Sequence, residues 1–129
     1  MRIFGIGIDI VQNKRIKSLI KNKNFLKRTF GNKEINFAKK FSNKTNYFAK
    51  RFAAKESFAK ALGTGFRNNL NLKDIEILND KVGKPYYSKT KKIDNIIKKE
   101  YKINNYDLFL SISDEKDYSV AFTIIQKNL

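Results

Sequence analysis

The stretch FGIGIDIV at positions 4–11 most constrains the fold, because it combines alternating apolar residues with two glycines and an acid. Side chains of a β-strand alternate between two faces. One face is wholly apolar and is expected to lie in the core, whereas the glycine face suits close approach of a ligand or another backbone. Asp9 either meets solvent or a lysine near the strand end, or belongs to a ligand site. The faces are Phe4, Ile6, Ile8 and Ile10 on one side, and Gly5, Gly7, Asp9 and Val11 on the other.

The chain has 129 residues and neither cysteine nor histidine. This length fits one domain, taken as residues 1–129. The composition excludes disulfides, cysteine nucleophiles, Ser-His-Asp triads and histidine metal ligands. Any metal must be a hard cation bound by oxygen, and magnesium is the default where phosphates are involved.

The charge is strongly positive, with 28 Lys and Arg against 12 Asp and Glu, a net +16. Such a chain attracts polyanions: nucleic acid, anionic membrane, phosphorylated cofactors or an acidic protein. Neither a signal peptide nor a membrane-spanning run is expected. We therefore expect a soluble, cytoplasmic protein.

The order of elements predicts an α+β fold, with a small antiparallel or mixed sheet packed with helices. The terminal segments DLFLSIS and YSVAFTII flank DEKD and predict a hairpin. Further strands are expected at 74–78 and after the VGKPYY turn. Helices are expected over 14–24, over 33–50 with a break near 42–45, over 51–62 with a stop at Gly63, and over 93–99.

The second informative stretch is RFAAKESFAKALGTG, at positions 51–65. Glu56 and Lys60 are four residues apart, so they are neighbours on one helix face, which by itself indicates a surface ion pair. The alanines around them make a slim helix, and Gly63 and Gly65 allow backbone to approach a ligand. A functional interpretation of Glu56 and Lys60 therefore stays open beside the structural one.

Asp9 and Glu56 together would supply two carboxylates for magnesium, with water and phosphate oxygens as its other ligands. Lys60, one turn from Glu56, would reach a phosphate, and Arg51 would make a two-pronged phosphate contact. The GKP sequence at 83–85 is either an ordinary turn or, if the fold carries it to the same cleft, a phosphate clamp.

Four segments, GIGIDIVQNKRI, RFAAKESFAKALGTG, VGKPY and LSIS, occur in this order over nearly the whole chain. In sequence and spacing they resemble the holo-acyl-carrier-protein synthase family of small 4′-phosphopantetheinyl transferases. The resemblance implies Mg²⁺-dependent transfer of phosphopantetheine from coenzyme A to a serine of an acyl carrier protein, for fatty acid synthesis, with release of adenosine 3′,5′-bisphosphate.

The resemblance also implies roles for individual residues. Asp9 and Glu56 would hold the metal, and together with Lys60 they would be catalytic, with Glu56 taking the serine proton. Family members form trimers with coenzyme A between subunits, so a homotrimer with shared sites is expected. Arg15 and Lys21 of the basic 14–24 helix would dock the carrier protein. The coenzyme A contacts would be Arg51, Lys60, Gly63, Thr64, Gly83, Lys84, Pro85 and Ser111.

The sequence departs from the family at Asp114, where the pattern after SIS usually has histidine. A carboxylate there repels a phosphate that an imidazolium would bind. The contact is then dispensable, or Lys116 replaces it, or the activity is reduced. Phe52 in place of a frequent tryptophan is a milder change.

Two other classes fit parts of the sequence. A basic RNA-binding or ribosome-associated module would use lysines on phosphates and exposed tyrosines for stacking. A membrane-surface protein would rest only on the basic 14–24 helix, whose apolar stripe is narrow. Paired acids beside a phosphate lysine do not suit RNA binding, so neither nucleic acid nor membrane is expected as a partner.

Overall fold

The computed structural model describes residues 1–63 and 69–129, and the predicted coenzyme A contact Thr64 lies outside them. Its elements confirm the predicted α+β class, and both sheets are antiparallel. The elements are β1 (Arg2–Gln12), α1 (Asn13–Leu19), α2 (Lys23–Thr29), α3 (Asn32–Ala38), α4 (Lys44–Leu62), the 3₁₀ turn η1 (Leu72–Asp74), β2 (Ile77–Asn79), β3 (Pro85–Tyr87), α5 (Lys91–Asn95), the π-helical segment η2 (Ile96–Glu100), β4 (Tyr106–Asp114) and β5 (Tyr118–Lys127).

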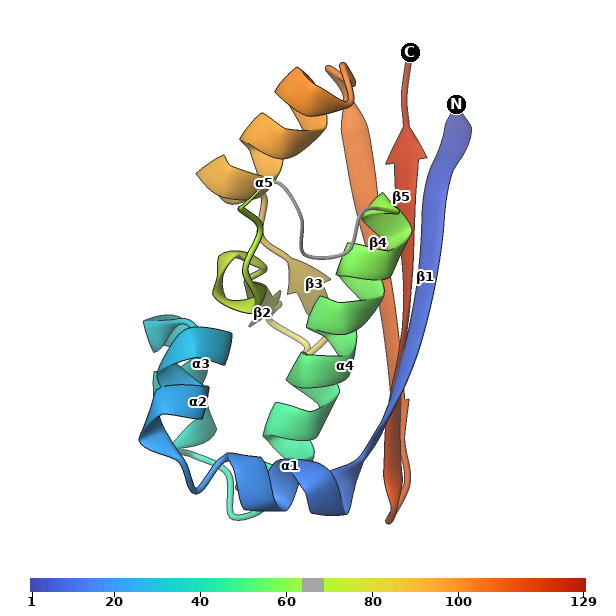
Figure 1. The fold of residues 1–129 in the computed structure, drawn as a ribbon. Helices are drawn as coiled ribbons and strands as arrows, with labels where there is room; N and C mark the ends of the chain where they lie inside the picture. Colours follow the sequence, from blue (N-terminus) through green and yellow to red (C-terminus); the bar gives the residue numbers. More distant parts are fainter. Residues whose placement is uncertain (64–68) are drawn as a thin grey trace.

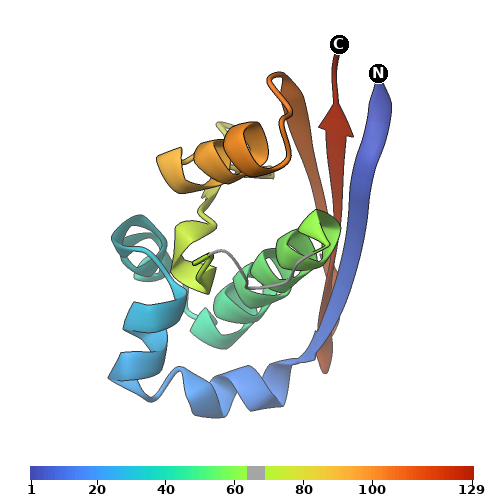
Figure 2. The ribbon, with the colours of Figure 1, turned by 45° about the horizontal axis from the view of Figure 1, so that its top comes forward.

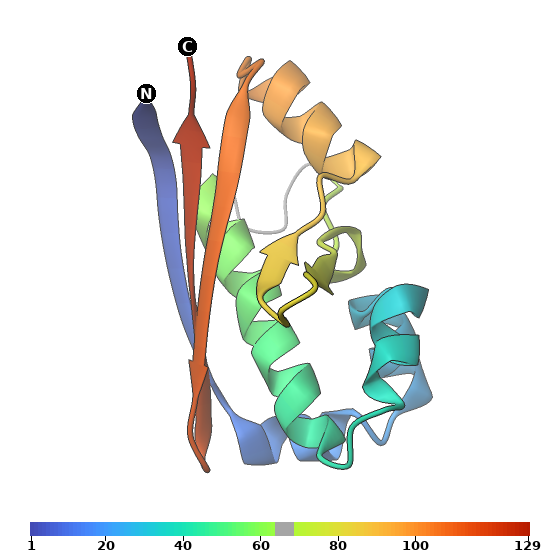
Figure 3. The same ribbon diagram turned by 180° about the vertical axis from the view of Figure 1, so that it is seen from behind.

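The main sheet has the strand order β1-β5-β4, so the last strand along the chain lies at its centre (Figure 1). β4 and β5 form the predicted terminal hairpin, and β5 pairs along its other edge with β1. A separate small hairpin joins β2 to β3, with Asn79 opposite Pro85. Seen from behind, this hairpin lies on the inner side of the main sheet, next to α4 (Figure 3).

Helix α4 lies along one face of the main sheet, and the other helices and the β2-β3 hairpin lie on that same side (Figure 2). None of the described helices covers the opposite face of the sheet. Among the described residues no helix has the length and apolarity that a membrane span requires.

The long helix α4 ends where its sequence predicts, but it begins earlier than the expected residue 51. The side chain of Asn43 accepts a hydrogen bond from the Asn46 backbone N–H at 3.1 Å and so caps the first turn. Gly63 ends the helix in a left-handed conformation, with φ of 86°. One continuous helix from Lys44 replaces the two segments expected over 33–50 and 51–62, while the expected break before it is confirmed at residues 39–43. The predicted 14–24 helix is likewise shorter, because α1 ends at Leu19.

The glycine face of β1 lies against the backbone of α4. A Cβ added to Gly7 would come within 2.0 Å of the Ser57 carbonyl oxygen, and one added to Gly5 within 1.9 Å of the Ala61 carbonyl oxygen. Side chains at these two positions would push the strand and the helix apart. The predicted close approach is therefore confirmed, and the approaching group is the α4 backbone.

The prediction that the isoleucine face of β1 is core is wrong for this chain. Ile6, Ile8 and Ile10 are 58%, 59% and 64% exposed, whereas Val11 on the glycine face is buried. Alternation defines two faces but does not decide which one a helix covers. Here the slim α4 takes the small-residue face, and the isoleucines point to the uncovered side of the sheet.

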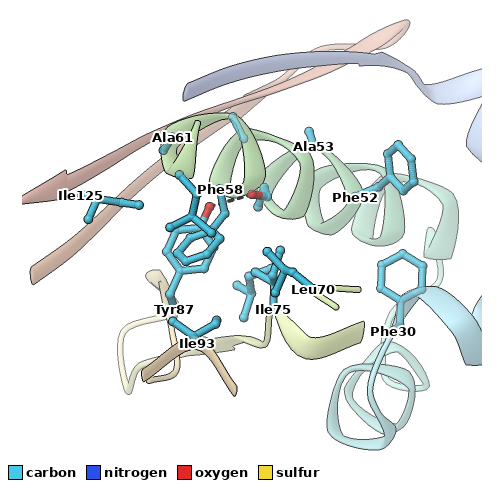
Figure 4. Packing of buried hydrophobic residues seen from close by; sticks show 14 of the residues in the cluster. Phe30, Phe52, Ala53, Phe58, Ala61, Leu70, Ile75, Tyr87, Ile93 and Ile125 are labelled. Atoms are coloured by element: carbon cyan, nitrogen blue, oxygen red, sulfur yellow. Dashed lines mark hydrogen bonds between the residues drawn. The ribbon is translucent and has the colours of Figure 1, made fainter. Parts of the chain in front are cut away.

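Most of the buried core lies on the side of α4 that faces away from the main sheet (Figure 4). The rings of Phe58 and Tyr87 have centroids 5.0 Å apart. The Tyr87 hydroxyl also donates a hydrogen bond to the Ala54 carbonyl oxygen at 2.7 Å, which links β3 to α4. A buried ion pair between Lys55 and Glu34, at 2.7 Å, joins α4 to α3.

Candidate active site

Asp9 and Lys60 meet at the edge of the sheet formed by β1. The Lys60 ammonium donates to a carboxylate oxygen of Asp9 at 3.0 Å and to the Ile8 carbonyl oxygen at 3.1 Å. The Asp9 side chain is largely buried, whereas that of Lys60 is more than half exposed. Asp9 therefore has a lysine partner, and that partner is one of the residues predicted for the site.

Glu56 lies near this pair, half-buried on α4. Burial and the negative charge of Asp9 raise the pKa of Glu56, while Lys60 and Arg15 oppose the rise. The helix-surface ion pair between Glu56 and Lys60 is not formed, since the ion pair that Lys60 makes is with Asp9. The fold thus brings two carboxylates and two cations together from two distant segments, residues 9–15 and residues 56–60.

A small apolar hollow adjoins Glu56. It measures about 390 Å³, and its lining includes Phe25, Phe52, Leu70 and Leu72. An apolar wall beside a carboxyl group disfavours the charged form, which accounts for burial being the first cause of its raised pKa.

The two predicted docking residues occupy different surroundings. Arg15 lies on α1 with its guanidinium 5.9 Å from the centre of the Phe52 ring, close enough to affect Glu56. Lys21 follows α1 and lines an open hollow of about 700 Å³. Three further lysines line the same hollow, namely Lys14, Lys17 and Lys116.

Arg51, Gly83 and Pro85 share one cavity of about 540 Å³, so the fold does bring the GKP turn to Arg51. The lining is rich in basic side chains, since it also includes Lys40, Lys50 and Lys81. Four other predicted coenzyme A contacts among the described residues do not line this cavity, namely Lys60, Gly63, Lys84 and Ser111. The Lys84 backbone N–H donates to Asp80 within the turn, and Ser111 is exposed on the uncovered side of the sheet.

Within one copy of the chain, this cavity is separate from the acid pair, Asp9 and Glu56. The cavity borders β4 through Ile112 and Asp114, whereas Asp9 lies on β1, at the other edge of the sheet. Along α4, Arg51 and Glu56 are five residues apart and so point to different sides of the helix. The predicted residues therefore form two separate groups.

Asp114 lies in the lining of the basic cavity, where its carboxylate accepts a hydrogen bond from the Asn46 amide. Sequence reasoning did not identify Asn79, Lys40 or Lys50 as cavity residues. Lysine and asparagine are abundant throughout this chain, so their type gave no signal. The available signal for Asn79 was its position, because it lies shortly before a glycine-containing turn and opposite Pro85.

Most of the tyrosines considered for base stacking lie in the core. Tyr47, Tyr87 and Tyr106 are at most 6% exposed, and the hydroxyl group of each makes a hydrogen bond. Tyr86 is 44% exposed. The stacking surface expected of an RNA-binding module is therefore largely missing from the described residues.

The chain matches the model of the 4′-phosphopantetheinyl transferase superfamily over residues 5–123. It is 59% identical over 127 residues to a holo-[acyl-carrier-protein] synthase of Pelagibacter ubique, covering 98% of this chain and 99% of that one. It is also 44% identical to the synthase of Clostridium botulinum, with 96% and 98% covered.

Solved structures give the same result. A holo-(acyl-carrier-protein) synthase from Bacillus anthracis in complex with CoA (3′,5′-ADP) superposes with a TM-score of 0.81 at 35% identity, covering 99% of this chain and 100% of that chain. The Helicobacter pylori synthase in complex with coenzyme A gives 0.79 at 30% identity, with 94% and 99% covered. Fold and sequence agree over nearly the full length, and the chain belongs to the holo-[acyl-carrier-protein] synthases of the 4′-phosphopantetheinyl transferase superfamily.

Proposed function

We propose that this protein transfers 4′-phosphopantetheine from coenzyme A to a serine of an apo acyl carrier protein, for fatty acid synthesis in the cytoplasm. The serine oxygen attacks the phosphorus that bears the pantetheine. A new phosphodiester bond forms as the bond from that phosphorus to the pyrophosphate bridging oxygen breaks. Adenosine 3′,5′-bisphosphate leaves with the electron pair.

The observation that carries the proposal is the meeting of Asp9, Glu56 and Lys60 at the β1 edge. Glu56 suits the role of general base, because its raised pKa lies closer to neutral pH. A carboxylate with a higher pKa accepts a proton more readily. The serine proton passes to Glu56. Lys60 would bind the pyrophosphate oxygens once they compete for its ammonium with Asp9.

The same residues fit Mg²⁺. Asp9 raises the pKa of Glu56, which means that two like charges lie close together, and a hard divalent cation relieves such repulsion. Asp9 and Glu56 would hold the ion, with phosphate oxygens and water as the other ligands. When bound, it would offset the negative charge that develops on the leaving phosphate.

The basic cavity supports binding of the phosphates of coenzyme A. Arg51 is 5% exposed, and the lysines on the cavity wall extend the positive surface around it. Charge-assisted hydrogen bonds to phosphate are among the stronger polar contacts that proteins make. The carboxylate of Asp114 makes one part of the wall less favourable for a phosphate.

A site shared between subunits reconciles the two groups of residues. We propose a homotrimer in which the acid pair of one protomer and the basic cavity of its neighbour bind the same coenzyme A. The separation of the two groups at opposite sheet edges supports this arrangement. So does the apolar outer face of the sheet, because exposed isoleucines favour an interface with another copy.

The carrier protein would dock on α1. Arg15 on α1 and Lys21 just after it supply positive charge, and Arg15 lies beside the catalytic Glu56. Contacts of this kind mainly speed encounter and orient the partner, so added salt should weaken them.

The decisive experiment is intact-mass spectrometry of apo acyl carrier protein after incubation with this protein, coenzyme A and Mg²⁺. A gain of one phosphopantetheine that a chelator abolishes is expected, with adenosine 3′,5′-bisphosphate in the supernatant. No gain with any of several carrier proteins, although coenzyme A binds, would overturn the proposed activity. Salt-sensitive RNA binding with no response to coenzyme A would favour the RNA-binding alternative.

A further inference from the structure

Asn79, the last residue of β2, contacts both Arg51 and the GKP turn. Its side-chain oxygen accepts a hydrogen bond from an Nη of Arg51. Its side-chain nitrogen donates to the Gly83 carbonyl oxygen at 2.9 Å. One amide therefore links α4 to the turn between β2 and β3, and it lines the basic cavity at the same place.

The chemistry of this link requires an amide. The oxygen acts as an acceptor towards a guanidinium, which can only donate, while the NH₂ acts as a donor towards a carbonyl, which can only accept. Aspartate would keep the first bond and lose the second, and alanine would lose both. Glutamine carries the same groups on a longer stem.

The other contacts of the Arg51 side chain come from residues outside the turn. Its Nε donates to the Tyr47 hydroxyl at 3.3 Å, its guanidinium lies 4.6 Å from the centre of the Tyr47 ring, and Glu34 approaches to 3.9 Å. These contacts come from α3 and α4. Asn79 is thus the contact that sets the position of Arg51 relative to the GKP turn.

The turn itself is well defined. Asp80 accepts from the backbone N–H groups of Val82 and Lys84, at 3.0 and 2.8 Å. Gly83 adopts a φ of 89°, which glycine accommodates without strain. The turn is thus held by its own hydrogen bonds and is joined to Arg51 through the Asn79 side chain.

We propose that Asn79 is a positioning residue for coenzyme A, holding Arg51 and the GKP turn at the spacing that its phosphates require; this rests on the proposed function. Asn79→Ala should raise the KM for coenzyme A roughly tenfold, which is the effect expected when a hydrogen bond to a charged group is lost. The KM for the carrier protein and kcat at saturating coenzyme A should change less than twofold. A merely structural role would instead lower the amount of folded, active enzyme.

Two further variants sharpen the test. In the Arg51→Ala background, Asn79→Ala should add little, because residues that act together give non-additive losses. Asn79→Asp, which keeps the acceptor for Arg51, should retain the order of the Arg51 side chain while still weakening coenzyme A binding. Asn104→Ala, at an exposed position remote from the cavity, is the matched control and should behave as wild type.

A second measurement separates failure of this inference from failure of the proposed function. The Nη–H resonance of Arg51 in ¹⁵N NMR spectra reports the order of the group that Asn79 binds, without any activity. It should be sharp in wild type and Asn79→Asp, and averaged in Asn79→Ala. An unchanged resonance together with an unchanged KM would overturn the inference. A wild-type protein that neither binds nor turns over coenzyme A would overturn the proposed function, and the resonance would still test the link.

Discussion

Glu56 is subject to opposing influences that its position in the fold creates. Burial and Asp9 favour its neutral form, while Lys60 and Arg15 favour its charged form. A base that accepts a proton in each turnover benefits from this balance, because both protonation states are accessible. Replacing Glu56 should therefore affect both catalysis and stability, in opposite directions.

Glu56→Gln should lower turnover by roughly 100-fold to 10,000-fold, the usual contribution of a general base, and Asp9→Asn should also remove most turnover. Both variants should keep the far-ultraviolet circular dichroism of wild type. Steady-state assays with saturating coenzyme A and Mg²⁺ are the measurement. Wild-type turnover in either variant would contradict the assignment of the acid pair.

The stability of the apo protein should depend on pH through the same carboxyl group. The pKa of Glu56 is raised in the folded state, so the folded protein binds this proton more tightly than the unfolded chain does. Stability from this group is then full below the ordinary pKa of 4.5 and is lost as the pH rises through the raised value. Glu56→Gln should melt above wild type at neutral pH and converge with it near pH 4. A variant that melts below wild type at neutral pH would show that the charged form of Glu56 does not destabilise the folded protein.

At the scale of elements, the contact between β1 and α4 dominates. The helix can lie close to the strand because Gly5 and Gly7 leave room for its backbone, and the buried alanines of α4 keep the helix slim. This close approach places Asp9 of β1 within reach of Lys60 on α4. The packing of two elements therefore sets the geometry of the candidate site.

Gly7→Ala tests this contact. Its Cβ would clash with backbone atoms of Ser57 and Ala61, at 2.0 and 2.7 Å, and backbone cannot rotate away as a side chain can. We expect a loss of roughly 2 kcal/mol or more in the free energy of unfolding, measured with denaturant. Gly31→Ala is the control, because its Cβ would lie 3.9 Å from the nearest atom, a Glu34 carboxylate oxygen. Equal losses in both variants would show that the close approach does not matter.

Helix α1 offers a second prediction at this scale. Arg15→Glu should raise the KM for the carrier protein more than the KM for coenzyme A, because in the proposed docking the positive charge on α1 attracts the carrier protein. The difference should shrink at high salt. Lys27→Glu, the same charge reversal in the last turn of α2, serves as the comparison. An unchanged carrier KM in Arg15→Glu would place the docking surface elsewhere.

At the scale of the whole molecule, the uncovered face of the sheet is the main feature without a partner in the described chain. It presents Ile6, Ile8 and Ile10 of β1 beside Phe122 of β5 and Phe109 of β4, each more than a third exposed. A patch of this composition is unusual on a monomer and favours association. Because the basic cavity and the acid pair lie at different sheet edges, association would also complete the proposed site.

Ile8→Asp should therefore dissociate the oligomer and lower activity together, while the circular dichroism spectrum stays that of a folded protein. Sedimentation equilibrium measures the mass of the assembly. Asn104→Asp adds the same charge at an exposed position outside the strands and should leave the proposed trimer intact. A wild-type protein that is monomeric and fully active would remove the argument for a shared site.

Local features of this fold were predictable from the sequence, and pairings between distant segments were less so. The stop of α4 at Gly63 and the terminal hairpin follow from local chemistry. The buried face of β1 does not, because it depends on which surface α4 covers. A lysine partner for Asp9 was one of the open alternatives, but its identity as Lys60 depends on how α4 packs on β1. The cavity role of Asn79 needed the register of the β2-β3 hairpin.

The place of β5 at the centre of the main sheet has a consequence for synthesis of the protein. β1 and β4 each pair with β5, and β5 is made after both of them. During translation the isoleucines of β1 stay exposed and its hydrogen-bonding edge stays unpaired until residues 118–127 emerge. Such long-range pairing folds slowly and exposes the nascent chain to aggregation. The native sheet is therefore completed only once β5 has been synthesised, and until then β1 and β4 both lack their pairing partner.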